Sequence, residues 1–428
     1  MRSTLSAGAY ARTLDHAPHL EMGASPRTAA ACPLACALFI SGLTLVHRRL
    51  RAENLVRGVS NSALWWLFQL VFLCSMVLMA ISCIVVTATS CDALSMLLLG
   101  NAWGLQLSPR LAFVASCPEG AGHCVGQGLF ALVAAANGTL ISAGYLVTVA
   151  ITLPLALVDV SESFQAASYF ISLAALLWLI GKFAAIAATS AHAHGDAAAV
   201  LPPVFLWNAG LALEVSFWSW TISFAVPMWL DEKDVAAPLA APLVASFAHR
   251  AALDLMLGYA GAAAFPHMPA TMLNVLDAVS IHPSCGTLTK AAGIIFVISS
   301  LASNIVDYAM VACRNLECHV GSNAANVVGV ALPFASGFLF YFGASFSDLI
   351  SIASPFLNGA IQFAVPALLF WSYARFEKAE ELSMLGMKAS TAAWRGIAMA
   401  LAIITGVLIV ITYAFPDNIV TDGGDYTS

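Results

Sequence analysis

Hydroxyl side chains gather just before a proline in the apolar stretch 202–229. The cluster consists of Ser216, Ser219, Thr221 and Ser223, and Pro227 follows it. In a membrane helix, serine and threonine can satisfy backbone groups that a break sets free, while proline removes one donor. The half-helix ends at such a break expose N–H and C=O groups whose dipoles suit a carboxylate or a cation. The pattern predicts a substrate site at a broken helix; the alternative is that these hydroxyls bond back to their own helix.

An acid and two indole rings lie in the same stretch. Glu214 should face the interior of a helical bundle, because ionisable groups inside membrane spans are costly when they face lipid. It could relay protons, neutralise a bound amine, or serve as a protonated structural acid. Trp218 and Trp220 could form the walls of a pocket for an apolar side chain. Tryptophan at segment ends is more often an interface anchor, but these two stand in the middle of the segment.

Further ionisable residues lie inside other apolar segments. Lys182 is the one lysine placed well inside a span, and burial lowers the proton affinity of lysine, as a proton switch requires. Because Lys182 lies late in its segment, snorkelling of the ammonium to the interface is the simpler interpretation. Asp307 stands in the middle of another segment, beside several serines, and its role is left open. Arg250 and Asp254 are spaced to pair at i and i+4 on one helix.

The elements that must position these residues are membrane helices. Of the 428 residues, 60% are hydrophobic and only 9% are charged, and the mean hydropathy is +0.86. Soluble proteins carry about 25% charged residues, so the natural solvent of this chain is lipid. The net charge of −6 is too small and too spread out to suggest nucleic acid binding. Signatures of enzymes such as the Walker A, GxGxxG and HExxH motifs are absent from the sequence, which implies neither catalysis nor a cofactor.

Ten hydrophobic segments divide the chain, and most are long enough to cross a bilayer. They are 31–46, 62–89, 138–158, 164–189, 202–229, 243–265, 290–313, 324–344, 347–373 and 393–415. Hydrocarbon permits only helices or closed barrels, and segments of this length exclude a barrel. We therefore predict an all-α, polytopic transmembrane helical bundle over 31–415. A poorly structured region, 1–30, precedes it, and a short polar tail, 416–428, follows it.

Several stretches, in their order and spacing, resemble a known family. The segment 62–89 leads into a turn of small residues that contains Asp92, and ISAGYLVTVAITLPLALVDVSESFQ follows. A later segment ends in Pro227, Trp229, Asp231, Glu232 and Lys233, where the family commonly has asparagine in place of Asp231. Next come Arg314-Asn315-Leu316 at a helix end and SPFLNGAIQFAVPALLF at 354–370. Together they resemble the amino acid/auxin permease family of transmembrane amino acid transporters, within the amino acid/polyamine/cation transporter superfamily.

The resemblance implies a LeuT-like transporter fold built from two inverted five-helix repeats. Segment 31–46 then corresponds to the family's second helix, so we expect about ten helices here, with the family's first helix missing. In this fold class the eighth helix contributes hydroxyls to a sodium site, for which Ser300 and Ser303 are the nearest candidates. The alternative is that small polar residues hold the helices together. In some proton-coupled relatives a fifth-helix lysine replaces the sodium ion, a role that Lys182 could take.

The sequence therefore predicts a secondary active transporter that moves amino acids across a membrane by alternating access. Coupling to a proton or a sodium gradient is expected, with protons preferred. The alternative is a truncated, non-transporting permease relative that acts as a receptor or partner subunit. Expected partners are an amino acid substrate, H⁺ or Na⁺, and membrane lipid, in a multi-pass protein of the plasma membrane or a vacuolar or other endomembrane. The predicted substrate-binding residues are Ser216, Trp218, Ser219, Trp220 and Ser223, and the predicted ion-coupling residues are Glu214, Lys182, Ser300, Ser303 and Asp307.

Overall fold

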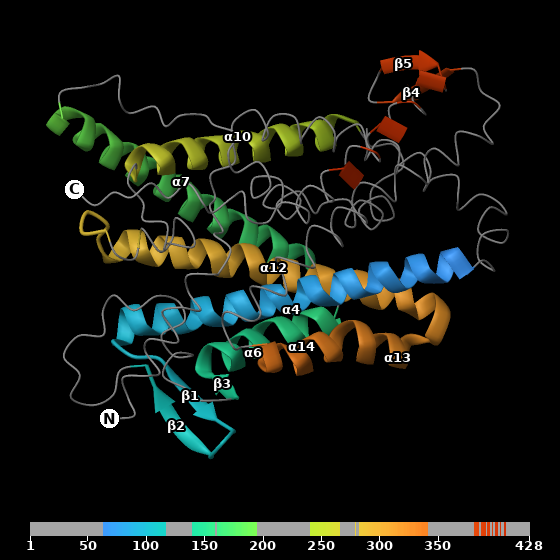
Figure 1. The fold of residues 1–428 in the computed structure, drawn as a ribbon, viewed down its shortest axis with the longest axis horizontal. Coiled ribbons are helices and arrows are strands. Elements are labelled where there is room, and N and C mark those ends of the chain that lie inside the picture. Colours follow the sequence, from blue (N-terminus) through green and yellow to red (C-terminus); the bar gives the residue numbers. More distant parts are fainter. Residues whose placement is uncertain are drawn as a thin grey trace. The chain divides into compact units, whose positions relative to one another are not determined.

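The computed structural model describes the chain in separate stretches. These are 63–116, 139–158, 161–194, 240–265, 279, 282–340, 381–384, 387–390, 392–393, 396, 399–400, 403 and 406–407. The chain divides into two compact units. Unit 1 comprises Met1–Leu20, Leu73–Pro202 and Tyr259–Ile350, and unit 2 comprises Glu21–Phe72, Pro203–Gly258 and Ser351–Ser428. Most described elements belong to unit 1 (Figure 1).

Long apolar helices dominate the described residues, as an all-α membrane protein requires. They are α4 (Ala63–Leu99), α6 (Ala143–Val158), α7 (Ser161–His194), α10 (Ala240–Ala264) and α12 (Thr287–Val320). Three stretches are long and apolar enough to cross a membrane: Leu70–Leu99, Ser163–Thr189 and Thr287–Glu317. The predictions of helices at 62–89, 138–158, 164–189, 243–265 and 290–313 agree with these five elements, although most ends differ by several residues.

Glycine sets the ends of two of these helices. Gly100 has φ 76° and donates its N–H to the Met96 carbonyl oxygen at 3.0 Å, which ends α4. Gly321 has φ 82° and donates to the Glu317 carbonyl oxygen at 3.2 Å, which ends α12. Positive φ costs glycine little, because it has no Cβ. Each glycine N–H also satisfies a carbonyl oxygen of the last helical turn.

The predicted helix at 324–344 is divided into short pieces rather than continuous. They are α13 (Ser322–Asn326), the π-helix η3 (Val327–Ala331), α14 (Leu332–Gly337) and the 3₁₀ turn η4 (Phe338–Phe340). Within η3, a Cβ on Gly329 would lie 2.6 Å from the Cys313 backbone nitrogen. This chain segment therefore packs backbone against backbone on α12, an approach that only glycine allows. The wider π turn shifts the register at the contact.

Two small antiparallel sheets were not predicted. One has the order β2-β1-β3, from β1 (Trp103–Gln106), β2 (Ala112–Ala115) and β3 (Leu140–Ser142). The other pairs β4 (Glu381–Met384) with β5 (Met387–Ser390). The described residues are mostly helical, as the all-α prediction expects, and these two sheets are local exceptions. The strands are only three or four residues long, so their alternating pattern is too short to distinguish them from loops in the sequence.

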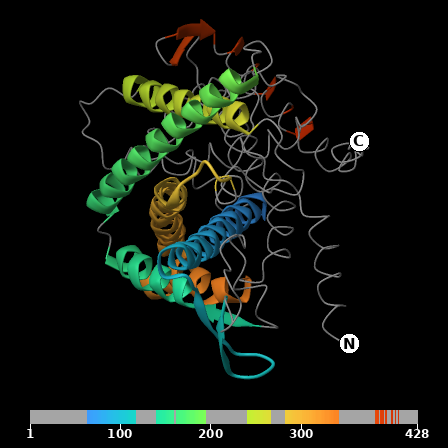
Figure 2. The same cartoon turned by 90° about the vertical axis from the view of Figure 1, so that its left-hand side faces the viewer.

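The core of unit 1 lies where α12 packs against α7, α6 and η3. Figure 2 shows α7 crossing α12, with α6 and the pieces after α12 on its other side. On α12, Ile305, Val306 and Ala309 are fully buried, and Phe183 is fully buried on α7. Tyr308 on α12 is buried as well. Small and branched side chains let the helices approach closely without gaps, as membrane bundles require.

Candidate functional site

The structure describes only part of the predicted site. The predicted substrate-binding residues, together with Glu214, lie outside the described residues; they are Ser216, Trp218, Ser219, Trp220 and Ser223. Four predicted ion-coupling residues are described: Lys182 on α7, and Ser300, Ser303 and Asp307 on α12. Because α7 and α12 pack against each other, these four residues all lie on one helix pair. The domain boundaries at 30 and 416 also lie outside the described residues.

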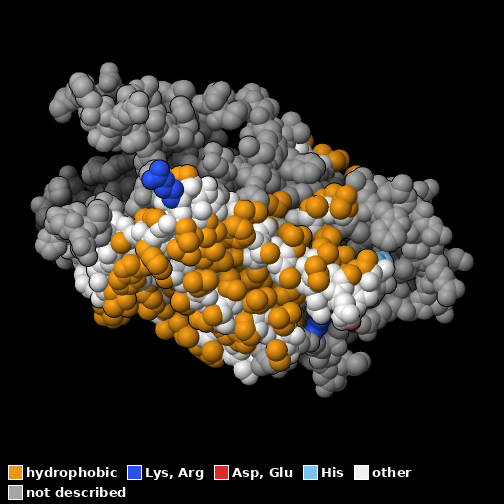
Figure 3. Space-filling view, turned by 90° about the horizontal axis from the view of Figure 1, so that it is seen from below, with side chains coloured by type: hydrophobic (Ala, Val, Ile, Leu, Met, Phe, Trp, Pro, Cys, Tyr) orange, Lys and Arg blue, Asp and Glu red, His pale blue; other side chains and the backbone are white. Residues whose placement is uncertain are grey.

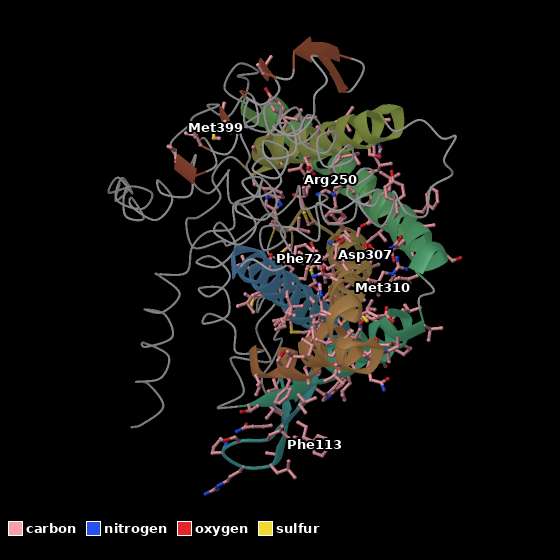
Figure 4. The ribbon with its side chains drawn as sticks, turned by 90° about the vertical axis from the view of Figure 1, so that its right-hand side faces the viewer. Phe72, Phe113, Arg250, Asp307, Met310 and Met399 are labelled. Carbon is pink, nitrogen blue, oxygen red and sulfur yellow. The ribbon has the colours of Figure 1, made fainter. Side chains whose placement is uncertain are left out.

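Asp307 forms a hydrogen bond across this helix pair. The Nε2 amide of Gln165, near the start of α7, donates to the Asp307 Oδ1 atom. Both side chains are half-buried, and Figure 4 shows Asp307 on α12 among other side chains. A charge inside apolar helices is costly unless it is paired or hydrogen-bonded. Gln165 therefore explains how α12 carries an acid at this depth.

Two more polar contacts join the same helices. The Ser299 hydroxyl bonds back to the Ile295 carbonyl oxygen at 2.7 Å and also lies 3.2 Å from the Ser172 hydroxyl. The Ser172 hydroxyl is 3.4 Å from the Phe296 carbonyl oxygen. Further along, the Trp178 indole N–H donates to the Thr289 hydroxyl at 3.4 Å. Along these contacts the residue numbers rise on α7 and fall on α12, so the two helices are antiparallel. We call the three pairs Gln165–Asp307, Ser172–Ser299 and Trp178–Thr289 the polar seam.

The polar seam extends through much of the helix pair. Residues 165 and 178 are thirteen apart on α7, which at 1.5 Å per residue is about 20 Å along the helix axis. That is a large part of the ~30 Å hydrocarbon thickness of a bilayer. Both helices are otherwise largely apolar, with mean hydropathies of 2.1 over Ser163–Thr189 and 1.8 over Thr287–Glu317. Figure 3 shows that hydrophobic side chains also cover much of one face of the described residues. The seam thus offers a line of hydrogen-bonding groups inside an apolar pair of helices.

Ser300 and Ser303 do not join the polar seam. The Ser300 hydroxyl donates to the Phe296 carbonyl oxygen at 2.7 Å, and the Ser303 hydroxyl donates to the Ser300 carbonyl oxygen at 3.0 Å. Both hydroxyls therefore bond back to α12 itself, a common arrangement for serine within a helix. Their oxygen lone pairs stay available to a cation, so the sodium-site prediction stays a prediction. Among the described residues, no three His, Cys, Asp or Glu side chains are grouped to hold a metal ion.

Lys182 lies beyond the polar seam, close to the chain that leads into α12. It is half-buried on α7, and its positive charge acts on the nearby Cys285 thiol. Burial raises the pKa of Cys285, while Lys182 and Lys290 oppose that rise by favouring the thiolate. The ammonium of Lys182 therefore lies near the end of the helix pair. This position suits the snorkelling interpretation of Lys182 and leaves its coupling role a prediction.

A second acid, Asp92, lies inside the bundle and accepts a hydrogen bond from a backbone N–H group. It is 3% exposed, and its Oδ1 accepts a hydrogen bond of 2.8 Å from the Gly144 N–H at the start of α6. A Cβ on Gly144 would lie 2.8 Å from the Asp92 Cγ and would collide with the Ala88 carbonyl oxygen. The carboxylate thus caps the positive end of the α6 dipole from α4. This is a structural role that the sequence reading did not identify.

Sequence reasoning also missed the α7 side of the polar seam. Gln165 and Ser172 are seven residues apart, so they lie on one face of a helix. Two polar residues on one face of an otherwise apolar segment are the signal that could have found them. The predicted pair of Arg250 and Asp254 on α10 is confirmed, with the Arg250 Nε and the Asp254 Oδ2 3.0 Å apart.

Comparison with known proteins adds no relative. No protein-family model matches the chain, and neither a curated protein nor a solved structure matches it.

Proposed function

We propose that this chain is a multi-pass membrane protein and a secondary active transporter of amino acids, coupled to a proton or sodium gradient. The observation that carries the proposal is the polar seam, with Asp307 and Gln165 inside two apolar helices of membrane-spanning length. Ionisable residues within spans mark ion and proton pathways by default. The resemblance to amino acid permeases supplies the substrate class, and no catalytic activity is proposed.

The chemistry of the Gln165–Asp307 contact favours proton coupling over sodium coupling. An ionised Asp307 accepts the hydrogen bond that the Gln165 amide donates. A protonated Asp307 could donate to the amide oxygen of the same side chain, because glutamine carries both a donor and an acceptor. A half turn of the Gln165 amide therefore serves both protonation states. A carboxyl that is satisfied in either state is suited to release and recapture a proton during a transport cycle.

The proposed substrate site lies in the stretch 202–229. There Ser216, Ser219 and Ser223 would bind the polar groups of the amino acid, and Trp218 and Trp220 would contact its side chain. Glu214 and Lys182 would assist proton transfer, and Ser300 and Ser303 are the candidates for sodium instead. In transporters of this class, substrate and ion sites lie near the bilayer midplane.

Uptake into proteoliposomes tests the proposal. The full chain is reconstituted, and the entry of a panel of labelled amino acids is measured under an imposed pH gradient, an imposed sodium gradient, or neither. The proposal expects accumulation driven by the pH gradient. Asp307→Asn should bring that accumulation to background, while Glu317→Gln, which alters an exposed acid on the same helix, should leave it unchanged.

Three results would contradict parts of the proposal. Inserted, folded wild-type protein that transports no amino acid under any gradient would favour a receptor or partner subunit. Uptake driven by sodium alone would reject proton coupling. Equal loss in Asp307→Asn and Glu317→Gln would mean that the polar seam has no special part in coupling.

A further inference from the structure

One face of the sheet β2-β1-β3 is apolar and exposed. Directly paired residues share a face of a sheet, and the register pairs Leu105 with both Phe113 and Ile141. Alternation along the strands adds further residues to this face. The apolar face thus consists of Trp103, Leu105, Leu107, Leu111, Phe113, Ala115 and Ile141. Phe113 is 91% exposed and Leu111 is 73% exposed, although both are large hydrophobic residues.

The opposite face of the sheet is packed inward over most of its length and mixes apolar with polar residues. Gly104, Gln106, Leu140 and Ser142 are buried there, Val114 is half-buried, and Ala112 is exposed. A Cβ on Gly104 would lie 2.6 Å from the Leu140 Cδ1 atom, and the Gln106 amide donates to the Ser108 carbonyl oxygen at 2.9 Å. A one-sided sheet in water turns its polar residues outward. Here two polar side chains, Gln106 and Ser142, are buried while large apolar side chains face outward, so the exposed face is more apolar than a sheet face in water.

The sheet directly follows a helix of membrane-spanning length. α4 ends at Leu99, its last residues Leu98 and Leu99 are exposed, and β1 begins at Trp103. Figure 1 shows β1 and β2 projecting sideways from that end of α4, and Figure 4 shows Phe113 pointing away from the helices. The sheet thus begins directly after the exposed apolar end of α4.

β1 and β2 form a hairpin, and the charges around this hairpin fit the edge of a bilayer. Between Asp92 and Glu119 the sequence holds one Lys, Arg, Asp or Glu side chain, which is Arg110 at the hairpin tip. Arg110 is exposed, and a long cationic side chain can reach phosphate groups while its stem stays in apolar surroundings. Aromatic residues such as Trp103 and Phe113 are enriched at the same level of the membrane.

Backbone hydrogen bonding limits how deep the hairpin can lie. Among the described strands, β2 pairs with β1 alone, so its other edge offers backbone groups that no described strand pairs with. An open sheet edge is not tolerated in hydrocarbon, but water and headgroups can satisfy it at the interface. The strands therefore belong at headgroup level, with the largest side chains reaching toward the acyl chains.

We infer that the β1–β2 hairpin lies in the membrane interface and binds lipid through its apolar face, with Phe113 and Leu111 as its deepest side chains. The inference rests on the membrane embedding in the proposed function and not on transport itself. The hairpin would fix the level of the α4 end in the bilayer. Arg110 would contact the phosphate groups above the two side chains.

Site-specific photo-crosslinking in proteoliposomes tests this inference on the full chain. Phe113→benzoylphenylalanine places a photoreactive group on the apolar face, and Ala112→benzoylphenylalanine places it on the neighbouring exposed residue of the opposite face. Phe170→benzoylphenylalanine, on an exposed residue of α7, reports on membrane embedding. After irradiation, mass spectrometry measures the fraction of protein carrying a lipid adduct, and gel electrophoresis measures crosslinked dimers.

We expect lipid adducts at positions 113 and 170, several-fold more than at position 112. Adducts at 170 without adducts at 113 would overturn the inference and leave membrane embedding intact. A dimer band at 113 in place of lipid adducts would overturn it in favour of a second copy of the chain as the occupant. Absence of lipid adducts at both 113 and 170 would overturn the membrane embedding as well.

Discussion

Asp92 and Asp307 are both acids inside apolar helices of unit 1, but their surroundings differ. Asp92 is buried and accepts a hydrogen bond from a backbone N–H at a helix start, where Gly144 leaves no room for movement. Asp307 is half-buried and meets the rotatable side-chain amide of Gln165. Backbone partners hold an acid in one state, whereas a glutamine partner can serve two states. The same residue type is therefore structural at one position and suited to proton exchange at the other.

The largest effect is expected at the glycine that holds Asp92 in place. Gly144→Ala would push a Cβ into Ala88 and Asp92, and overpacking of this kind costs up to about 3 kcal/mol in the free energy of unfolding. Thermal unfolding of the purified protein in detergent measures it. Gly181→Ala on α7 is the control, because nothing lies within 4 Å of a Cβ there. A control as unstable as Gly144→Ala would disprove the close approach.

Removal of the carboxylate at Asp92 should have the next largest effect. Asp92→Ala leaves the buried Gly144 N–H without its partner, which should cost about 2 kcal/mol in the free energy of unfolding. Asp92→Asn keeps an acceptor oxygen and should recover part of that loss. Unfolding of both variants by the same thermal assay checks this. If asparagine were as damaging as alanine, the charge and not the hydrogen bond would be the stabilising feature.

Removal of the charge at Asp307 should affect the stability of the protein less than removal at Asp92. Interhelical polar contacts in membranes average about 0.6 kcal/mol, so Asp307→Asn should lower the free energy of unfolding by less than about 1 kcal/mol. Its effect should instead fall on proton-driven uptake. Thermal unfolding and uptake are measured on the same preparation. An unfolding cost equal to that of Asp92→Ala would make Asp307 a structural acid too, and the contrast between the two positions would disappear.

The helices of unit 1 could be predicted from the sequence, but their contacts could not. Long apolar stretches identify α4, α7 and α12, since lipid leaves few alternatives to a helix. The sheet was missed because three or four residues give too short a pattern. Asp92 was noticed only as part of a motif, since its partner Gly144 lies 52 residues further along the chain. Gln165 was missed because its signal is weak: it shares one helix face with Ser172, and neither residue is charged.

The smallest expected effect tests whether the polar seam is a set of contacts between helices. A double-mutant cycle with Ser172→Ala and Ser299→Ala should give a coupling of about 0.6 kcal/mol, because their hydroxyls are 3.2 Å apart. Ser300 supplies the matched control, since both hydroxyls bond back to α12 at 2.7 Å but Ser299 also lies beside Ser172. The cycle of Ser172→Ala with Ser300→Ala should therefore give no coupling. Thermal unfolding of the single and double variants measures both cycles.

Equal coupling in the two cycles would mean that serine content, and not the pairing across the helices, determines stability. The polar seam would then end at Gln165–Asp307, and a path of polar groups along α7 and α12 would lose its support. Coupling of Ser172 with Ser299 but not with Ser300 would instead show that the polar seam continues at least two helical turns beyond Asp307. Asp307, unlike Asp92, would then be one member of a series of polar contacts, as proton movement along a helix pair requires.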